Sequence, residues 1–406
     1  MRNSGFMSAL LAMGVLTCIS SCFKEEPLNA ECDIEQAYIH AGDNLDSWFL
    51  FDSDTLKYVQ SDQNKIEFTM SGTADLTQIA PFFRLTPGAT ISPANGSVHD
   101  FSKGSVKYTV TSEDGQWTRI YFVSIKKMLE FGSEHEFDFE SFYQDKGYYI
   151  WTEPWKDSNG KSNKEPLWAT GNPGYKISNS STAAENYPTS PLEDGYEGKG
   201  VKLTTCRTSG LADMVQKPIA AGNLFIGQFD PSNALQDAMS ATKFGRPFSF
   251  ETPPKTITGY YKYKAGETFT DKYMHVLQQK DYGTIYAVLY DNHNAKGEAI
   301  VLYGNNVQTS DQVVALAVLD NIDNTPEWTP FTLNFVYRKS VDMKKLKTGG
   351  YSLTVVCSSS TYGAEFMGAV GSTLWVDKFK VTCEENSDLI GRVSSSVFLF
   401  LVSKTV

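Results

Sequence analysis

The segment Phe331-Thr-Leu-Asn-Phe-Val-Tyr337 places an apolar or aromatic side chain at every second position. The odd-numbered side chains point one way, whereas Thr332 and Asn334 point the other. A period of two is typical of an antiparallel strand with one face on a core and one face toward solvent. This stretch therefore predicts an antiparallel, half-buried sheet.

Similar strand patterns occur through the second half of the chain, and helical periodicity is scarce. We expect strands at 256–263, 284–290, 313–319, 351–357 and 374–381. One short helix is expected at 232–241. Two antiparallel sheets with long loops predict a jelly roll, a type of β-sandwich, over residues 136–383.

The region 32–127 has shorter strand-like runs, at 65–70, 106–111 and 117–123. Turn sequences such as Glu113-Asp-Gly115 separate these runs. About 95 residues of this pattern predict an immunoglobulin-like (Ig-like) β-sandwich. The chain is thus expected to be all-β, with residues 128–135 linking the two domains.

The composition agrees with an extracellular all-β protein. Aromatic residues make up 13% of the 406 residues, and charged residues make up 20%. The net charge of -11 argues against a nucleic-acid partner, because binding phosphates requires a basic surface.

The N-terminus has the layout of a signal peptide. A positive start at Arg2 precedes an apolar stretch, 6–19, that is too short to span a bilayer. The sequence Ile19-Ser-Ser-Cys22 resembles the lipobox of bacterial lipoproteins, which implies cleavage after residue 21 and lipidation of Cys22. Cys18 is a rival cleavage point, and an ordinary secretory signal is the other alternative.

After Cys22, residues 22–31 are expected to form a tether. Its start, Phe23-Lys-Glu-Glu-Pro27, resembles the surface-export signal of Bacteroidetes lipoproteins. The resemblance implies a lipid anchor in the outer membrane, an outward-facing protein and outer-membrane protein partners. Residues 384–406 form a tail of unclear origin, whose apolar part is too short to cross a membrane.

With Cys22 lipidated, four cysteines remain, which allow three pairings. Their spacing does not suggest a zinc site. Cys357 lies on the apolar face of its expected strand and is interpreted as a buried thiol.

Several motifs of the larger domain resemble one family. They are Trp168-Ala-Thr-Gly-Asn-Pro-Gly-Tyr175, Pro218-Ile-Ala-Ala-Gly-Asn-Leu-Phe-Ile-Gly-Gln-Phe229, Phe244-Gly-Arg-Pro-Phe248, Gly259-Tyr-Tyr-Lys-Tyr-Lys-Ala-Gly266 and Ser358-Ser-Ser-Thr-Tyr-Gly-Ala-Glu-Phe-Met-Gly-Ala-Val-Gly-Ser-Thr-Leu-Trp-Val-Asp377. Together they resemble the putative carbohydrate metabolism domain (PCMD) of Bacteroidetes lipoproteins, over roughly residues 136–383. The resemblance implies a glycan-related function without assigning catalytic residues. In the N-terminal region, Phe83-Arg-Leu-Thr-Pro-Gly-Ala-Thr-Ile-Ser-Pro93 and Tyr108-Thr-Val-Thr-Ser-Glu-Asp-Gly-Gln-Trp117 resemble Ig-like modules of Bacteroidetes surface lipoproteins, which implies that this module is a spacer.

Sugar recognition needs aromatic faces together with amide or charged groups. Residues 148–196 are rich in both, and further polar candidates lie outside this region. The candidate glycan-binding residues are Trp151, Trp155, Trp168, Asn172, Tyr175, Tyr187, Arg246 and Glu365. The alternatives are that the aromatic residues plug the ends of the sandwich and that Arg246 forms a buried ion pair.

Asp377 is a candidate metal ligand. By strict alternation it shares a face with Trp375, Phe379 and Val381, where an unpartnered carboxylate is costly. Carbohydrate-binding jelly rolls often hold a structural calcium ion (Ca2+) between their first and last strands, and Glu140 is the expected second ligand. The alternative is that Asp377 accepts hydrogen bonds from backbone amides or pairs with Lys or Arg.

These observations lead to three functional hypotheses. The first is a surface-anchored glycan-binding lipoprotein that contributes to carbohydrate capture or metabolism. The second is a glycoside hydrolase, which requires two facing carboxylates. Candidates for them are Glu153, Asp157, Glu193, Asp194, Asp281 and Glu365, with Glu365 first. The third is an adhesive or structural surface protein.

Overall fold

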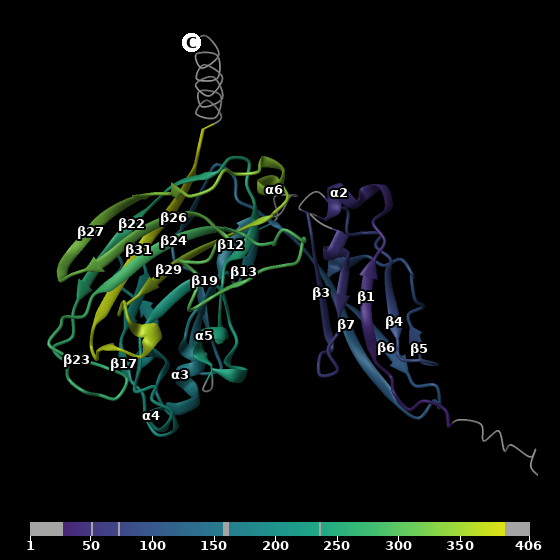
Figure 1. Ribbon diagram of the computed structural model, residues 1–406, viewed down its shortest axis with the longest axis horizontal. Helices are drawn as coiled ribbons and strands as arrows, with labels where there is room; N and C mark the ends of the chain where they lie inside the picture. Colours follow the sequence, from purple (N-terminus) through teal and green to yellow (C-terminus); the bar gives the residue numbers. More distant parts are fainter. Residues whose placement is uncertain (1–26, 50–51, 72–73, 157–161, 235–236, 386–406) are drawn as a thin grey trace, which may run out of the picture. The chain divides into compact units, whose positions relative to one another are not determined.

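The computed structural model describes residues 27–385 except 50–51, 72–73, 157–161 and 235–236 (Figure 1). The expected signal peptide, the Cys22 lipidation site, the first half of the 22–31 tether, Asp157 and nearly all of the 384–406 tail lie outside the described residues. Within them, no helix has the length and apolarity that crossing a bilayer demands.

Contacts between Cα atoms divide the described chain into two compact units. The smaller unit takes in the residues up to Ile39 together with Lys57–Ile66 and Gln78–Ser124. The larger unit takes in His40–Leu56, Glu67–Thr77 and the residues from Ile125 onward.

The first 127 residues supply two antiparallel sheets. One sheet has the order β2-β1-β4, and the other has the order β3-β7-β6-β5. Alternation is clear in β3, where Ile66, Phe68 and Met70 are buried and the residues between them are exposed. The strands are β1 (Ile34–Ile39), β2 (Leu56–Tyr58), β3 (Lys65–Met70), β4 (Pro81–Leu85), β5 (Thr90–Ser92), β6 (Val106–Thr111) and β7 (Thr118–Lys127).

The larger unit contains a six-stranded sheet of order β15-β16-β31-β22-β27, with β9 beside β31. Its strands are β9 (Glu134–Phe137), β15 (Thr189–Leu192), β16 (Gly200–Thr204), β22 (Pro254–Lys264), β27 (Thr325–Asn334) and β31 (Thr373–Cys383). The second sheet is ten-stranded, with the main order β25-β20-β19-β29-β24-β26-β28. Its main strands are β19 (Asn223–Phe229), β20 (Thr242–Phe244), β24 (Gly283–Asp291), β25 (Leu302–Tyr303), β26 (Val313–Ile322), β28 (Val336–Tyr337) and β29 (Tyr351–Ser358). Three short strands join it at its side: β8 (Leu129–Glu130), β14 (Trp168–Ala169) and β21 (Arg246–Ser249).

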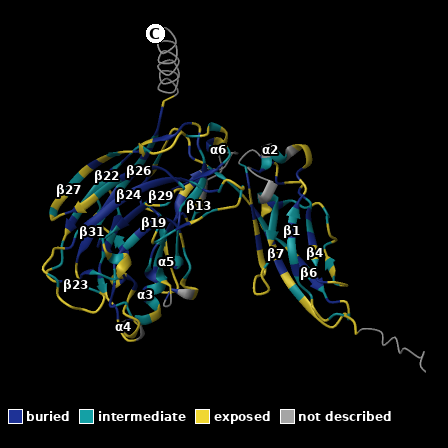
Figure 2. Cartoon of the chain, viewed as in Figure 1, coloured by how far each residue is buried: buried dark blue, intermediate teal, exposed yellow. Residues whose placement is uncertain are grey.

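The two sheets of the larger unit enclose one core, which confirms the predicted β-sandwich. Alternate side chains of β24, such as Ile285 and Leu289, join Val376 and Phe379 of β31 in this core. The intervening side chains of β24, such as Tyr286, form a second apolar cluster on the other face of the ten-stranded sheet. Figure 2 shows β24 and β29 dark blue, whereas β22 and β27 of the six-stranded sheet include exposed segments. We call the face of each sheet that is turned away from the shared core its outer face.

Helices are few and short. Figure 1 shows α3 (Asn172–Ser178), α4 (Leu211–Met214) and α5 (Ala238–Ala241) at one end of the larger unit, and α6 (Met343–Lys347) at the other end. The continuous helix expected at 232–241 is wrong. The chain forms a 3-10 turn, η5 (Pro231–Asn233), and then α5, which begins at its own N-cap, Asp237.

A bulge in β31 corrects the prediction for Asp377. Lys378 adopts a φ of 53°, and the pairing with β22 shifts register between Thr258 and Tyr260. The extra residue changes the phase of the strand, as β-bulges do. Val376 and Phe379 therefore both enter the core. Asp377 keeps the phase of Trp375 but does not share a face with Phe379 and Val381, as strict alternation had predicted.

The four cysteines within the described residues, Cys32, Cys206, Cys357 and Cys383, are free thiols. Cys357 is buried in the shared core, as predicted, and burial raises the pKa of its thiol.

Candidate functional site

A cavity of about 420 Å³ lies on the outer face of the ten-stranded sheet. Strands β19, β20, β24, β26 and β29 supply its floor, and α3, α5, residues 304–309 and η6 (Gly363–Glu365) supply its walls. The volume falls within the range of small-molecule and sugar-sized sites.

The cavity floor follows from the sequence of β24, which is apolar on both faces. Eight of its nine residues, Gly283 through Tyr290, are buried. A strand of this kind must be covered on both sides. The six-stranded sheet covers one side, and the short helices and loops around the cavity cover the other only in part.

Aromatic side chains line much of the cavity. Phe225 and Phe244 pack at a ring-centroid distance of 5.0 Å, and Phe229 and Phe366 are only half-buried. Half-buried rings offer a face to the apolar C–H side of a sugar. The aromatic lining residues are Tyr175, Phe225, Phe229, Phe244, Tyr286 and Phe366.

Polar groups are interspersed with these rings. Asp320 accepts a hydrogen bond of 2.8 Å from the Thr284 hydroxyl, and the Lys217 ammonium lies 5.0 Å from the centroid of the Phe366 ring. Such groups satisfy sugar hydroxyls. The polar and charged lining residues with longer side chains are Lys217, Asn223, Asn305, Gln308, Asp320 and Glu365.

Asp281, a buried carboxylate, holds the loop that carries Glu365 and Phe366. One of its oxygens accepts hydrogen bonds from the Ser360 hydroxyl at 2.6 Å, the Ser372 hydroxyl at 2.7 Å and the Ala369 amide at 2.7 Å. These hydrogen bonds hold three positions of the motif 358–377. Asp281 is thus a structural group that positions one cavity wall.

Most of the aromatic residues predicted from the 148–196 region lie inside the fold. Trp155 stacks between His135, at 4.1 Å, and Phe248, at 5.5 Å. Trp151, Trp168 and Tyr187 are at most 3% exposed. Their burial fits the alternative in which aromatic side chains plug the sandwich.

The remaining candidates divide between structural positions and the cavity. Asn172 is fully buried and exchanges two hydrogen bonds with the Thr189 backbone, which attaches α3 to β15. Tyr175 and the exposed Glu365 both line the cavity, so the structure brings these two together. Arg246 is half-buried on β21 and is not among the lining residues. Within the described chain its guanidinium forms no ion pair.

Glu153, one of the candidate acids, is buried behind the cavity sheet. Its Oε1 accepts a hydrogen bond of 2.7 Å from the Trp168 indole. Its Oε2 has no partner among the described residues. Burial raises the pKa of Glu153 to about 8, although the hydrogen bond from Trp168 opposes this shift.

The two predicted metal ligands, Asp377 and Glu140, accept hydrogen bonds from the same loop. Asp377 accepts a hydrogen bond of 3.0 Å from the Glu197 amide, and Glu140 accepts one of 2.7 Å from the Lys199 amide. Burial raises the pKa of Asp377 to about 6. Among the described residues, no group of three or more His, Cys, Asp or Glu side chains is placed to hold a metal ion. The geometry therefore fits the hydrogen-bonded alternative better than a calcium site with ~6–8 oxygen ligands.

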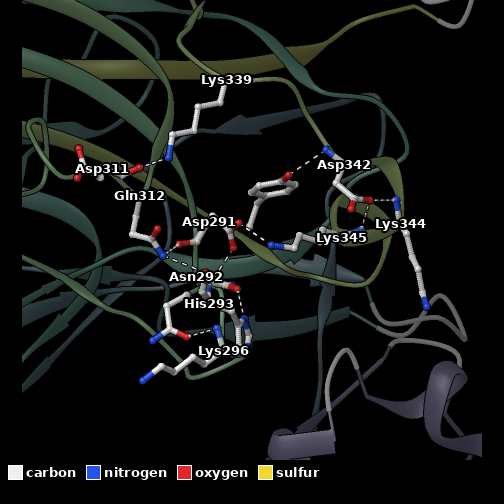
Figure 3. A network of polar contacts seen from close by, with 12 residues as sticks. Asp291, Asn292, His293, Lys296, Asp311, Gln312, Lys339, Asp342, Lys344 and Lys345 are labelled. Carbon is white, nitrogen blue, oxygen red and sulfur yellow. Dashed lines mark hydrogen bonds and ion pairs between the residues drawn. The ribbon is translucent and has the colours of Figure 1, made fainter.

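A second polar cluster lies at the far end of β24 and has a structural role (Figure 3). Asp291 pairs with Lys345 at 2.6 Å, and Asn292 donates to the Gly349 carbonyl at 2.8 Å. Gln312 donates to the backbone carbonyls of Asp291 and His293. These bonds connect β24 to α6 and leave the polar groups occupied by protein partners.

Sequence reasoning missed most of the cavity residues, including Phe229, Tyr286 and Asp320. The strands of Tyr286 and Asp320 were predicted, but β19, which carries Phe229, and the loops that cover the outer face were not. The available signal was the doubly apolar pattern of β24, which indicates a second covered face.

Comparisons with known proteins cover both regions of the chain. A family model described as "Putative carbohydrate metabolism domain" matches residues 138–382, and one described as "SGBP, N-terminal" matches residues 48–125. A crystal structure from Bacteroides thetaiotaomicron, described as a putative glycoside hydrolase, is 35% identical with a TM-score of 0.66, and the match covers 89% of this chain and 100% of that one. Another, from Bacteroides vulgatus and described in the same words, is 37% identical with a TM-score of 0.54, and the match covers 61% and 98%. No curated protein matches the sequence.

Proposed function

The chain belongs to the putative carbohydrate metabolism domain family, and we propose that it binds a glycan in the aromatic cavity of its larger unit. The observation that carries this proposal is the cavity itself, with half-buried rings and dispersed polar groups on one sheet of a β-sandwich. Relatives with similar structures are described as putative glycoside hydrolases, so a carbohydrate ligand suits both the site and the family.

In the proposed complex, aromatic rings contact the apolar face of the sugar and polar groups contact its oxygens. Phe229 and Phe366 stack on the apolar face of a pyranose, where aromatic packing adds ~0.5–1.5 kcal/mol beyond area burial. Asp320 and Glu365 accept hydrogen bonds from sugar hydroxyls, and Lys217 donates to ring or hydroxyl oxygens. All five residues lie on the same cavity lining.

A glycan array tests this proposal, using the chain that begins at Phe23 and retains both units. We expect binding to at least one neutral glycan, which Phe229→Ala weakens on the order of tenfold. Tyr143→Ala removes an exposed ring outside the cavity and serves as the matched control. No binding across host and plant glycans would overturn the proposal.

A glycoside hydrolase is the second candidate, because Asp320 and Glu365 place two carboxylates in one cavity. Both side chains are exposed, and neither is desolvated in the way a general acid at neutral pH requires. Binding without cleavage is therefore the favoured function. Product analysis of every bound glycan decides between them, with Asp320→Asn and Glu365→Gln as variants that abolish turnover if cleavage occurs.

We further propose that acyl chains on Cys22 anchor the protein in the outer membrane, facing outward, where it assembles with outer-membrane protein partners. The lipobox-like sequence and the SGBP-type match at 48–125 support this location. Surface proteolysis of intact cells tests it. Cys22→Ser should release the protein from the membrane, and an unchanged membrane fraction would contradict the anchor.

We propose separately that Glu140 and Asp377 bind a structural calcium ion. It would replace the amide hydrogen bonds that these carboxylates accept from the loop at Glu197 and Lys199. Calorimetry with added calcium or chelator tests it. A rise in Tm of several degrees with calcium, lost in Asp377→Asn, is the outcome that would support the ion.

A further inference from the structure

Four side chains on the outer face of the six-stranded sheet form a row across four strands. Lys202 of β16 lies opposite Trp375 of β31, and Trp375 lies opposite Lys262 of β22. Residues directly opposite each other share a face of the sheet. Trp328 of β27 completes the row, because the Lys262 ammonium lies 4.7 Å from its ring centroid and 5.7 Å from that of Trp375. We call these four residues the lysine–tryptophan row.

The row is accessible and bounded by a further ring. Trp328 and Trp375 are half-buried. Tyr196 is 45% exposed, stacks on Tyr260 at 3.5 Å and meets Trp328 edge-on at 6.3 Å. The loop that holds Tyr196 is fastened to Asp377. The aromatic surface is therefore built on the sheet and on a loop attached to the same sheet.

The lysines of the row differ from other lysines in and beside the sheet. Lys199, Lys378 and Lys380 each pair with a glutamate at 2.7–3.2 Å. Within the described residues, Lys202 and Lys262 form no ion pair, and the Lys262 ammonium lies near the two indole rings. Lys264, exposed two residues along β22, has no carboxylate partner there either. A chain of net charge -11 thus keeps a local group of lysines without ion-pair partners beside two half-buried indoles.

From this arrangement we propose that the lysine–tryptophan row binds an acidic polysaccharide in which uronate sugars alternate with neutral ones. Indole faces fit the apolar side of a pyranose, and an ammonium pairs with a uronate carboxylate. Adjacent strands are ~4.8 Å apart, so Lys202 and Lys262 are separated by ~10 Å, a distance comparable to one disaccharide. The contact of Lys262 with two rings orients its ammonium before binding. This second site is independent of the glycan proposed for the cavity.

Other partners fit the row less well. A neutral glycan would not need unpaired lysines. A nucleic acid brings a phosphate at every nucleotide, and the acidic chain around the row repels such a dense charge. An alternating uronate chain places one carboxylate beside each lysine and a neutral ring beside each indole, which matches the order of the row.

Titration calorimetry on the chain beginning at Phe23 tests the proposal. The probes are non-sulfated chondroitin, in which uronates alternate, polygalacturonate, in which every sugar is a uronate, dextran as the neutral glycan, and oligo-dT as the nucleic acid. We expect chondroitin to bind best and more weakly at high salt, because exposed charge pairs are screened. Trp328→Ala with Trp375→Ala should weaken it about tenfold. Lys262→Met should weaken it about threefold and reduce the salt dependence.

Two controls separate the row from general effects. Lys380→Met removes a lysine of the same sheet that is already paired with Glu134, and it should leave chondroitin binding unchanged. Phe229→Ala in the cavity should also leave it unchanged, which distinguishes failure of this proposal from failure of the cavity proposal. The Lys262→Met variant keeps both indoles in place if the tryptophan pair proves necessary for folding. Equal binding of dextran or oligo-dT, no chondroitin binding, or equal loss in Lys380→Met would overturn the proposal.

Discussion

The two outer faces of the larger sandwich are both rich in aromatic residues but are built differently. On the ten-stranded sheet, loops and short helices rise around the strands and form a closed-in cavity. On the six-stranded sheet, the side chains of the strands themselves form the surface, and the Tyr196 loop adds to it. The first face depends on loop positions held by buried polar groups, whereas the second depends on strand register.

This difference has a functional consequence. A cavity recognises the shape of a short ligand segment from several sides, whereas an open row recognises repeated features along a chain. Cavity residues come from segments far apart in sequence, such as Tyr175 and Phe366. The residues of the row are neighbours through cross-strand pairing, as Trp375 and Lys262 are. Substitutions that loosen the loops around the cavity should therefore weaken binding at the cavity and leave binding at the lysine–tryptophan row unchanged.

The largest expected effect is that of replacing Asp281, which should impair the cavity and not the row. Asp281→Ala removes the acceptor for Ser360, Ser372 and the Ala369 amide, and unsatisfied buried donors cost ~1–3 kcal/mol each, so we expect a loss of about 3–5 kcal/mol. Urea denaturation measures this loss. Cavity binding should fall while chondroitin binding at the row persists. Asp311→Ala, on an exposed carboxylate, is the control, and equal weakening of both faces would contradict the comparison.

The second prediction concerns the pH dependence of stability that buried Glu153 produces. The folded-state pKa of Glu153 is raised to about 8, above its unfolded value of about 4.3, so protonation favours the folded state. Stability should increase as pH falls from about 8 toward 4.3, by on the order of a few kcal/mol. Glu153→Gln should flatten this dependence in thermal unfolding at several pH values. An unchanged slope in the variant would refute the assignment to Glu153.

The smallest expected effect is the change in stability caused by replacing Lys262 on the open face. Lys262→Met removes two cation–π contacts, which at exposed positions contribute ~0.5–1 kcal/mol, and it leaves the strand pairing intact. Thermal unfolding should therefore show a shift of only a few degrees. A large loss of stability would mean that Lys262 stabilises the fold. The row would then have a structural role, as Asp281 has at the cavity wall.

Local alternation predicted the main strands of the larger unit well. The segments 284–290 and 351–357, for example, lie within β24 and β29. The same alternation failed at Asp377, because a bulge depends on how β31 pairs with β22 and leaves no local periodic signal. Local patterns also do not show which of the candidate aromatic side chains are buried. Trp155 and Trp168 come from a segment with weak periodicity, yet long-range packing buries them.

The sequence by itself indicated the all-β class, an Ig-like region followed by a jelly roll, and the family resemblance. Each of these follows from short-range patterns, since side-chain alternation and turn residues act within a few positions of one another. Only the tertiary structure decided which aromatic residues are accessible and which carboxylates are engaged. Accessibility is the result of contacts between distant segments, such as the one that covers Trp155 with Phe248 and the register that places Trp375 beside Lys262.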